Sequence, residues 1–188
     1  MAEEKFKRYV APYYWEKRTW YHTQSQFKYA RRALIETLIR DNVKTVLDIG
    51  CGHGLGSVEI MEAGIEYVGV DPLEANLRQA RIDNPAGDFR LGYMQELPFK
   101  DKCFEAAMDV GCWEILPTVE DMRQGLSEAL RVAQRRYYSL CCQPKPVYMV
   151  ERYMMIPMSL GLEIRRVSYD AAKKKANYLW VVDLEGIK

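Results

Sequence analysis

The sequence predicts an α/β fold with a Rossmann-like open, mainly parallel sheet, helices on both faces and a C-terminal antiparallel hairpin. Strand-like runs of β-branched residues alternate with helix-like stretches over residues 43–142. Two further strand-like runs, at residues 162–169 and 177–184, are joined by a segment too short for a parallel crossover and should pair antiparallel. We expect the 188 residues to form a single domain.

The first part of this pattern is a predicted β-α-β unit. Residues 43–49 are a β-branched run that ends in glycines, and residues 67–71 are a second such run. The helix between them is expected over residues 56–63. It should end at Gly64, because glycine readily adopts the left-handed conformation that follows a helix.

The next helix is expected to start at Asp71 and Pro72, since Asp caps free amide groups and Pro is tolerated in the first helical turn. Its inward face should carry Leu73 and Leu77. Residues 84–88 contain Pro and Gly and should end it.

Two strands and one more helix complete the parallel part. Residues 89–91 and 104–110 are expected to be strands, and the mixed apolar content of the second suits a sheet covered on both faces. Thr118 with Asp121 is typical of a helix start, and residues 137–142 follow as a strand. The inward face of that helix is predicted to carry Met122, Leu126, Ala129, Leu130 and Ala133.

The charge balance gives no reason to expect a nucleic acid or a membrane as partner. Lys and Arg number 27 and Asp and Glu number 26, for a formal charge of +1. The N-terminus is charged and no run approaches the roughly 20 apolar residues of a membrane span, so we expect a cytoplasmic protein. Arg135, Arg136 and the basic residues at 165–166 and 173–175 leave an RNA partner open.

Neither a disulfide framework nor a metal site is predicted. The five cysteines are irregularly spaced and contain no Cys-x-x-Cys pair. His22 and His53 are the available imidazoles, and neither has a carboxylate at metal-binding spacing.

Residues 45–54, Thr-Val-Leu-Asp-Ile-Gly-Cys-Gly-His-Gly, are the segment most informative about function. Glycine-rich turns at the carboxyl ends of parallel strands let the backbone approach a ligand closely. The dinucleotide fingerprint would need a third glycine where Leu55 or Ser57 stands. Asp48 just before the turn would oppose a pyrophosphate but suits an ammonium group or an ordered water beneath it. Asp71, at the end of the second strand, can accept hydrogen bonds from both ribose hydroxyls.

With these features, residues 46–54 resemble motif I of the class I S-adenosylmethionine (SAM)-dependent methyltransferases, and residues 68–71 resemble the acidic motif that follows it. Residues 92–99, 104–105 and 126–132 resemble later landmarks of the small-molecule branch, which is methyltransferase type 11-like and includes quinone-biosynthesis enzymes. The resemblance implies the seven-stranded methyltransferase fold, with SAM as cofactor and S-adenosylhomocysteine as product.

The resemblance also implies a set of cofactor-binding residues. Residues at the methionine end are Asp48, Gly50, Cys51 and Gly52. Asp71 would bind the ribose, and Pro72 or Leu73 would cover the adenine face. Met94 and Gln95 would lie at the adenine edge, and Val110 with Gly111 at the methyl-transfer site. The sequence departs from the family where Tyr93 replaces an acid, Glu105 an Asp, Ile115 a His, and residues 134–136 a Gly-Gly turn.

Catalytic residues are harder to assign, because methyl transfer can proceed by alignment of donor and acceptor without a dedicated base. Residues 1–30 form an aromatic-rich segment that either acts as a lid over the cofactor or packs on the sheet. Tyr14 and His22 in this segment, and Glu114 after the strand at 104–110, are the candidate catalytic residues.

The resemblance implies an enzyme that methylates O, N or C of a small or lipid-like apolar molecule. Two other functions stay open: an RNA or protein methyltransferase, and a noncatalytic SAM-binding or partner-stabilising module. The oligomeric state is not predicted.

Overall fold

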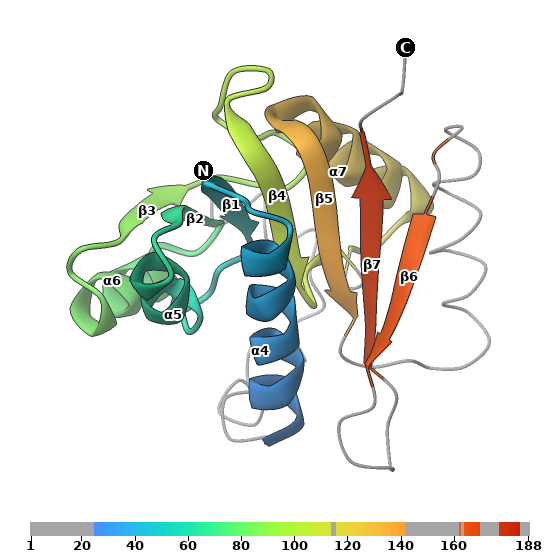
Figure 1. The fold of residues 1–188 in the computed structure, drawn as a ribbon. Coiled ribbons are helices and arrows are strands. Elements are labelled where there is room, and N and C mark those ends of the chain that lie inside the picture. Colours follow the sequence, from blue (N-terminus) through green and yellow to red (C-terminus); the bar gives the residue numbers. More distant parts are fainter. Residues whose placement is uncertain (1–24, 114–115, 142–161, 163, 170–176, 185–188) are drawn as a thin grey trace.

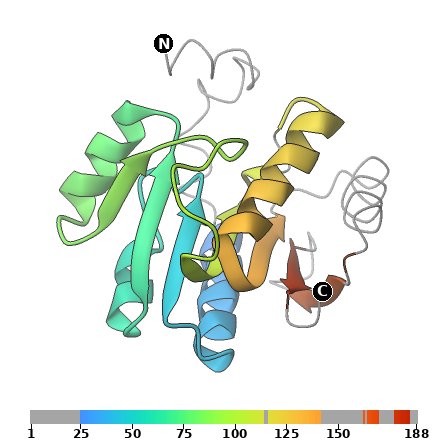
Figure 2. The ribbon, with the colours of Figure 1, turned by 90° about the horizontal axis from the view of Figure 1, so that it is seen from above.

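The computed structural model describes residues 25–113, 116–141, 162, 164–169 and 177–184 (Figure 1). These residues contain a seven-stranded sheet in the order β3-β2-β1-β4-β5-β7-β6. Figure 2 shows β3 and β6 at opposite edges of this sheet. The predicted mainly parallel sheet with a terminal hairpin is therefore confirmed.

The pairing of the strands divides the sheet into two parts. Neighbours among the first five strands are parallel, whereas β7 is antiparallel to both β5 and β6. The strands are β1 (Thr45–Ile49), β2 (Glu66–Asp71), β3 (Asp88–Leu91), β4 (Phe104–Val110), β5 (Ala133–Cys141), β6 (Ile164–Tyr169) and β7 (Asn177–Asp183).

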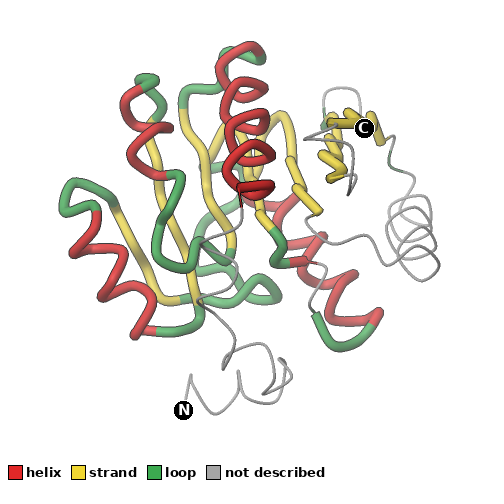
Figure 3. The backbone as a smooth tube through the Cα atoms, turned by 90° about the horizontal axis from the view of Figure 1, so that it is seen from below, coloured by secondary structure: helices red, strands yellow, loops and turns green. Residues whose placement is uncertain are grey.

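Helices cover both faces of the sheet, as Figures 1 and 3 show. They are α4 (Ser25–Arg40), α5 (Ser57–Glu62), α6 (Glu74–Asp83) and α7 (Val119–Val132). On one face Leu34 of α4, Ile60 of α5 and Leu77 of α6 share a buried cluster. On the other face, Met122 and Leu126 of α7 belong to a second cluster. The sheet therefore lies between two separate hydrophobic cores.

Side chains along the strands point alternately into these two cores. Val46 of β1 belongs to the cluster beneath α4, α5 and α6, whereas the next residue, Leu47, belongs to the α7 cluster. Tyr137 and Tyr138 of β5 divide in the same way. Successive strand residues point to opposite faces, which explains the continuously apolar strands in the sequence.

Two predicted element ends are confirmed. Gly64 follows α5 with a φ of 77°, the left-handed conformation expected after that helix. At the start of α7, the Thr118 side chain accepts a hydrogen bond from the backbone N–H of Asp121 at 3.0 Å. This satisfies one of the free amide groups of the first turn.

Two predicted boundaries are wrong. Asp71 does not start a helix but ends β2, and α6 begins at Glu74. The Asp71 carboxylate accepts from the backbone N–H of Leu73 at 2.9 Å and so closes a local turn before the helix. Ala133 was expected on α7 but begins β5, because its extended backbone pairs with Phe104 of β4. Residues 134–136 are consequently strand residues.

Candidate functional site

The carboxyl ends of β1, β2 and β4 meet at one edge of the sheet. Ile49 lies opposite Val70 on β2 and opposite Asp109 on β4. Asp48, Asp71 and Asp109 are therefore brought together, and each is at least 94% buried (6%, 4% and 1% exposed). Such an edge is where open α/β sheets bind ligands.

The turn that follows β1 depends on glycine. Gly50, Gly52 and Gly54 have φ values of 74°, 57° and 67°, which other residues rarely adopt. A Cβ atom on Gly50 would in addition lie 2.6 Å from the Sγ atom of Cys112. The predicted tight turn after β1 is thus required both by backbone conformation and by close packing.

Hydrogen bonds fix this turn to the neighbouring strand. The N–H groups of Gly50 and Cys51 both donate to the Val70 carbonyl, at 2.7 and 3.0 Å. The Gly52 N–H donates to Asp71 Oδ2 at 3.0 Å. By contrast, a Cβ atom on Gly52 would meet no atom of the described residues within 4 Å. The turn therefore has an open side at Gly52, while these three amides hold it against β2.

Asp71 connects three elements through one carboxylate. Its Oδ2 atom accepts from Gly52 of the glycine turn, and its Oδ1 atom accepts from Leu73 N and from Asn76 Nδ2 of α6, at 2.9 and 2.7 Å. Hydrogen bonds to a carboxylate stabilise its charged form and fix its orientation. The predicted ribose-binding residue is thus held in one position.

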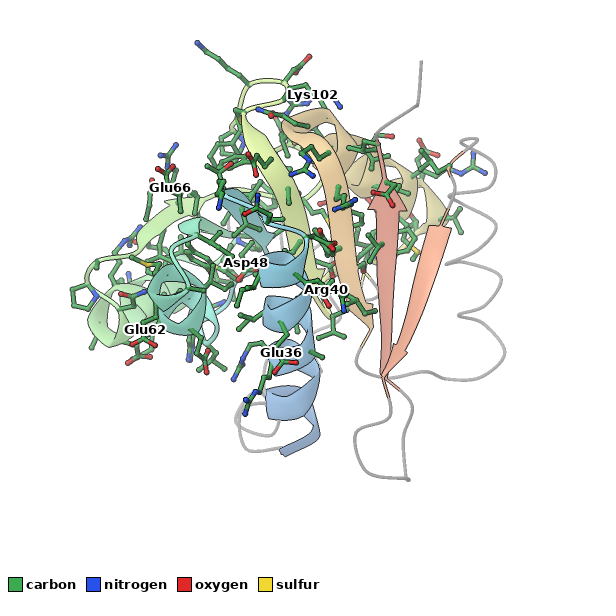
Figure 4. All side chains as sticks on the ribbon, in the orientation of Figure 1. Glu36, Arg40, Asp48, Glu62, Glu66 and Lys102 are labelled. Atoms are coloured by element: carbon green, nitrogen blue, oxygen red, sulfur yellow. The ribbon has the colours of Figure 1, made fainter. Side chains whose placement is uncertain are left out.

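Asp48 lies beneath the glycine turn, beside α4 in Figure 4. Its Oδ2 atom accepts a hydrogen bond of 2.7 Å from the Tyr67 hydroxyl on β2. The pKa of Asp48 is raised from 3.8 to about 7, chiefly by burial and also by the charges of Asp109 and Asp71, although the hydrogen bond from Tyr67 lowers it. The Asp48 carboxyl group is consequently only partly ionised near neutral pH.

Arg31 of α4 is a site residue that the sequence analysis missed. Its side chain packs against Gly56, where a Cβ atom would lie 3.0 Å from the Arg31 Cδ atom. Its positive charge is among the influences that lower the pKa of Asp48. The neighbouring Arg32 instead pairs with Glu36 on the exposed side of the helix. The sequence shows two adjacent arginines, and only the packing of α4 distinguishes their roles.

Met94 and Gln95, both predicted to lie at the adenine edge, have different environments in the structure. Met94 is 4% exposed and packs in the α7 core, where it lies close to Gly125. Gln95 is half-buried, and its Nε2 atom is buried without a hydrogen-bond partner among the described residues. An unpartnered buried amide is costly and is consistent with an acceptor supplied by a ligand. Pro72 and Leu73, which follow Asp71 directly, are half-buried.

Asp109 organises the loop after β4. It accepts from the N–H groups of Cys112 and Trp113 at 2.9 and 3.0 Å, and from the Tyr137 hydroxyl at 2.5 Å. Burial raises the pKa of Asp109. Sequence analysis had assigned the methyl-transfer site to Val110 and Gly111, next to this aspartate, but gave Asp109 no role.

Several predicted residues lie outside the described part of the chain. These are Tyr14, His22 and Glu114, together with the aromatic segment up to residue 24. His53 lies half-buried within the glycine turn. Among the described residues, no group of three or more His, Cys, Asp or Glu could hold a metal ion. None of the described helices is long and apolar enough to cross a membrane.

Comparison with known proteins identifies the family. Residues 46–136 match the family model described as a methyltransferase domain. A probable SAM-dependent methyltransferase of Mycolicibacterium smegmatis is 30% identical over 89 residues, covering 47% of this chain and 34% of that protein. Residues 46–136 are a class I SAM-dependent methyltransferase domain. SAM is the cofactor of this class.

Other relatives of this methyltransferase domain differ widely in their named substrates. The 18S rRNA (guanine-N(7))-methyltransferase of Bos taurus is 38% identical over 87 residues, covering 45% of this chain and 31% of that protein. The fatty-acid O-methyltransferase of M. smegmatis is 33% identical over 109 residues, covering 56% and 39%. The chain therefore spans only about a third of the length of the curated relatives it matches.

Solved structures share the fold of the methyltransferase domain. Magnesium protoporphyrin IX methyltransferase from Synechocystis PCC 6803 with bound SAM has a TM-score of 0.69 at 20% identity, covering 84% of this chain and 80% of that one. The 1,6-didemethyltoxoflavin-N1-methyltransferase of Burkholderia thailandensis has a TM-score of 0.72 at 14% identity, covering 90% and 83%.

The described residues of the methyltransferase domain fit SAM in three respects. The glycine turn has an open side at Gly52. Asp71 is held by Gly52, Leu73 and Asn76, and the Gln95 amide lacks an acceptor within the described chain. The first feature admits a ligand close to the backbone, and the other two offer an acceptor for hydroxyl groups and a donor for a ring nitrogen.

The buried Asp48 predicts a pH-dependent stability. Because its pKa is raised to about 7 in the folded chain, the folded protein binds more protons than the unfolded chain between about pH 4 and pH 7. The free energy of unfolding should therefore fall as pH rises through this window. In the Asp48→Asn variant, the loss of Tm between about pH 5 and pH 8 should shrink by at least about 3 °C in thermal unfolding without cofactor.

The matched control is Asp83→Asn, which changes an exposed carboxylate on α6. This variant should retain the wild-type dependence of Tm on pH. An unchanged dependence in Asp48→Asn would show that Asp48 is not the titrating group.

Proposed function

We propose that this chain transfers a methyl group from SAM to an O, N or C atom of a small or lipid-like apolar molecule. The observation that carries the proposal is the Asp71 carboxylate, fixed at the carboxyl end of β2 beside an open glycine turn. This arrangement presents a hydrogen-bond acceptor to ribose hydroxyls where the class binds its cofactor.

The residues of the chain would bind and align the reactants. Bound SAM supplies an electrophilic methyl group on a sulfonium. Asp71 accepts hydrogen bonds from the ribose, and the Gln95 amide donates to an adenine ring nitrogen. Arg31 offers a cation for the carboxylate of the methionine end, and Asp48 places negative charge beneath its ammonium group. Alignment of this kind can account for a large part of the rate of an in-line displacement.

The described acceptor side favours an apolar molecule. Val110, Gly111 and Cys112 follow β4 and are half-buried and uncharged. The Asp109 carboxylate beside them is buried under the hydrogen bonds of its own loop. Val110, Gly111 and Cys112, the residues described at this position, carry no cation, which supports an acceptor that is not strongly anionic. The fatty-acid acceptor named for one relative is lipid-like, with a single carboxylate.

Two of the arginines that left RNA open, Arg135 and Arg136, lie at the opposite end of the sheet. Arg136 pairs with Ala106 at the start of β4, far from the carboxyl end of that strand. Its guanidinium pairs with Asp183 and lies 3.4 Å from Asp41. Arg135 lies 3.9 Å from Glu105. Their charges are therefore engaged within the chain, which weakens the case for RNA even though one relative is named as an rRNA methyltransferase.

The cofactor assignment predicts that Asp71→Ala strongly weakens SAM binding. Loss of charge-assisted hydrogen bonds to the ribose should lower the affinity by at least about 100-fold in isothermal titration calorimetry. Asp101→Ala, which removes an exposed carboxylate paired with Arg131, should bind SAM as the wild type does. Absence of SAM binding by the wild type, or equal binding by Asp71→Ala, would defeat the assignment.

The unpartnered amide of Gln95 predicts opposite effects on binding and stability. In Gln95→Leu, affinity for S-adenosylhomocysteine should fall about tenfold, because a donor to adenine is lost. The Tm without ligand should stay equal or rise, because a buried unsatisfied group is removed. The preference for S-adenosylhomocysteine over its inosine analogue, measured by calorimetry, should narrow.

Gln79→Leu is the matched control, since Gln79 of α6 bonds Asp83 and lies outside the site. It should leave the preference for the adenine ligand unchanged. A preference that survives in Gln95→Leu would rule out a role for this amide at the adenine.

The acceptor class predicts where a radioactive methyl group appears. After incubation of the chain and labelled SAM with fractionated cell extract, the label should enter molecules that resist nuclease and protease and partition into organic solvent. Label removed by nuclease or by protease would replace the proposal with an RNA or a protein acceptor. Binding of SAM without any labelled product would favour the noncatalytic module.

A further inference from the structure

Asn76 is a polar residue at an inward position of an amphipathic helix. The buried residues of α6 are Asn76, Leu77 and Ala80, and Asn76 is only 1% exposed. Asn favours helix formation less than most residues, and burial of an amide is costly unless it is hydrogen-bonded. A buried amide at this position, in the first turn of the helix, therefore needs a specific partner.

The partner of Asn76 is the carboxylate that the proposed function assigns to the ribose. Its Nδ2 atom donates to Asp71 Oδ1 at 2.7 Å, which is the shortest of the hydrogen bonds described for this carboxylate. Leu73 N donates to the same oxygen, whereas Gly52 N donates to Oδ2. Two donors on Oδ1 and one on Oδ2 together fix the rotation of the carboxylate about its Cβ–Cγ bond.

We propose that Asn76 is a positioning residue, which holds the Asp71 carboxylate in the orientation that receives the ribose hydroxyls of SAM. This inference rests on the proposed function, since it assigns Asn76 a part in cofactor binding. Two further described donors, Gly52 and Leu73, are backbone N–H groups of turns that any side chain at position 76 would leave in place. Among the described hydrogen bonds, that of Asn76 secures the carboxylate from a side chain of the helix.

The physical basis is preorganisation. A carboxylate that rotates freely must be ordered when the ligand binds, and the cost of this ordering reduces affinity. Without the Asn76 amide, Oδ1 would lose a charge-assisted hydrogen bond in a buried setting. The effect should be confined to the ligand groups that Asp71 contacts, namely the ribose hydroxyls.

The test compares two ligands, S-adenosylhomocysteine and the same compound without its two ribose hydroxyls. In the wild type, calorimetry should show at least about 30-fold tighter binding of the complete ligand. In Asn76→Leu, which has similar volume but no donor, affinity for the complete ligand should fall about tenfold, and affinity for the dideoxy ligand by less than about threefold. Asp71→Ala should remove the discrimination entirely.

Asn84→Leu is the matched structural control. Asn84 is also buried at the end of α6, and its Nδ2 atom donates to Ser57 Oγ at 2.9 Å rather than to Asp71. Ser57 in turn donates to the Gly54 carbonyl of the glycine turn. Loosening of the turn by Asn84→Leu should therefore affect both ligands equally. An equal loss for both ligands in Asn76→Leu would reduce Asn76 to the same structural role and overturn the proposal.

A second variant keeps the proposal testable if Asn76→Leu does not fold. In Asn76→Asp, two carboxylates face each other at about pH 8, and the discrimination between the ligands should be lost. At about pH 5.5 a shared proton can restore a donor toward Asp71 Oδ1, and the discrimination should return. A discrimination that does not vary with pH in this variant would contradict the proposal.

The outcomes also separate this inference from the proposed function. Failure of the wild type to bind either ligand would defeat the cofactor assignment itself. Normal discrimination by the wild type, with an unselective effect of Asn76→Leu, would leave SAM binding intact and remove only the positioning role.

Discussion

Three adjacent parallel strands each bring a buried aspartate to one edge of the sheet, and much of the site follows from satisfying these carboxylates. A buried carboxylate is costly unless donors surround it. Asp48 accepts from Tyr67, Asp71 from the glycine turn and α6, and Asp109 from the loop after β4 and from Tyr137. The turn after β1, the start of α6 and the loop after β4 are thus each fixed by a hydrogen bond to an aspartate.

Carboxylates at the two ends of the sheet have different kinds of partner. At the amino ends of β4 and β5, carboxylates pair with arginines, as Glu105 does with Arg135 and Asp183 with Arg136. At the carboxyl ends, Tyr67 and Tyr137 and backbone amides serve as donors, and burial raises the pKa of both Asp48 and Asp109. Burial disfavours the charged form of these two carboxyl groups, and a ligand with cationic groups would stabilise that form. SAM carries two such groups, the sulfonium and the ammonium.

Much of the fold was predictable because its signals are local. Glycines after β1, Gly64 after α5 and Thr118 before α7 act within a few residues, so sequence patterns show them. The predicted start of α6 was misplaced because Asp is a residue type that often caps helices. The Asp71 carboxylate also accepts a hydrogen bond from Gly52, nineteen residues earlier, and the sequence does not show this contact. Arg31 and Asp109 were missed for a similar reason: their roles depend on contacts that only the assembled sheet and helices create.

The same distinction explains why the cofactor is easier to recognise than the acceptor. Several of the residues proposed to face the cofactor come from β1, β2 and the segments immediately after them, and Asn76 lies only five residues from the Asp71 carboxylate that it bonds. Geometry of this kind is encoded in one short stretch and constrained by the charge of a single ligand. The proposed acceptor side instead begins with the uncharged residues Val110 and Gly111 after β4, which do not specify one acceptor. The chemistry of the acceptor therefore has to be determined from the labelled product. On the cofactor side, by contrast, variants that each remove one hydrogen bond can test the contacts singly.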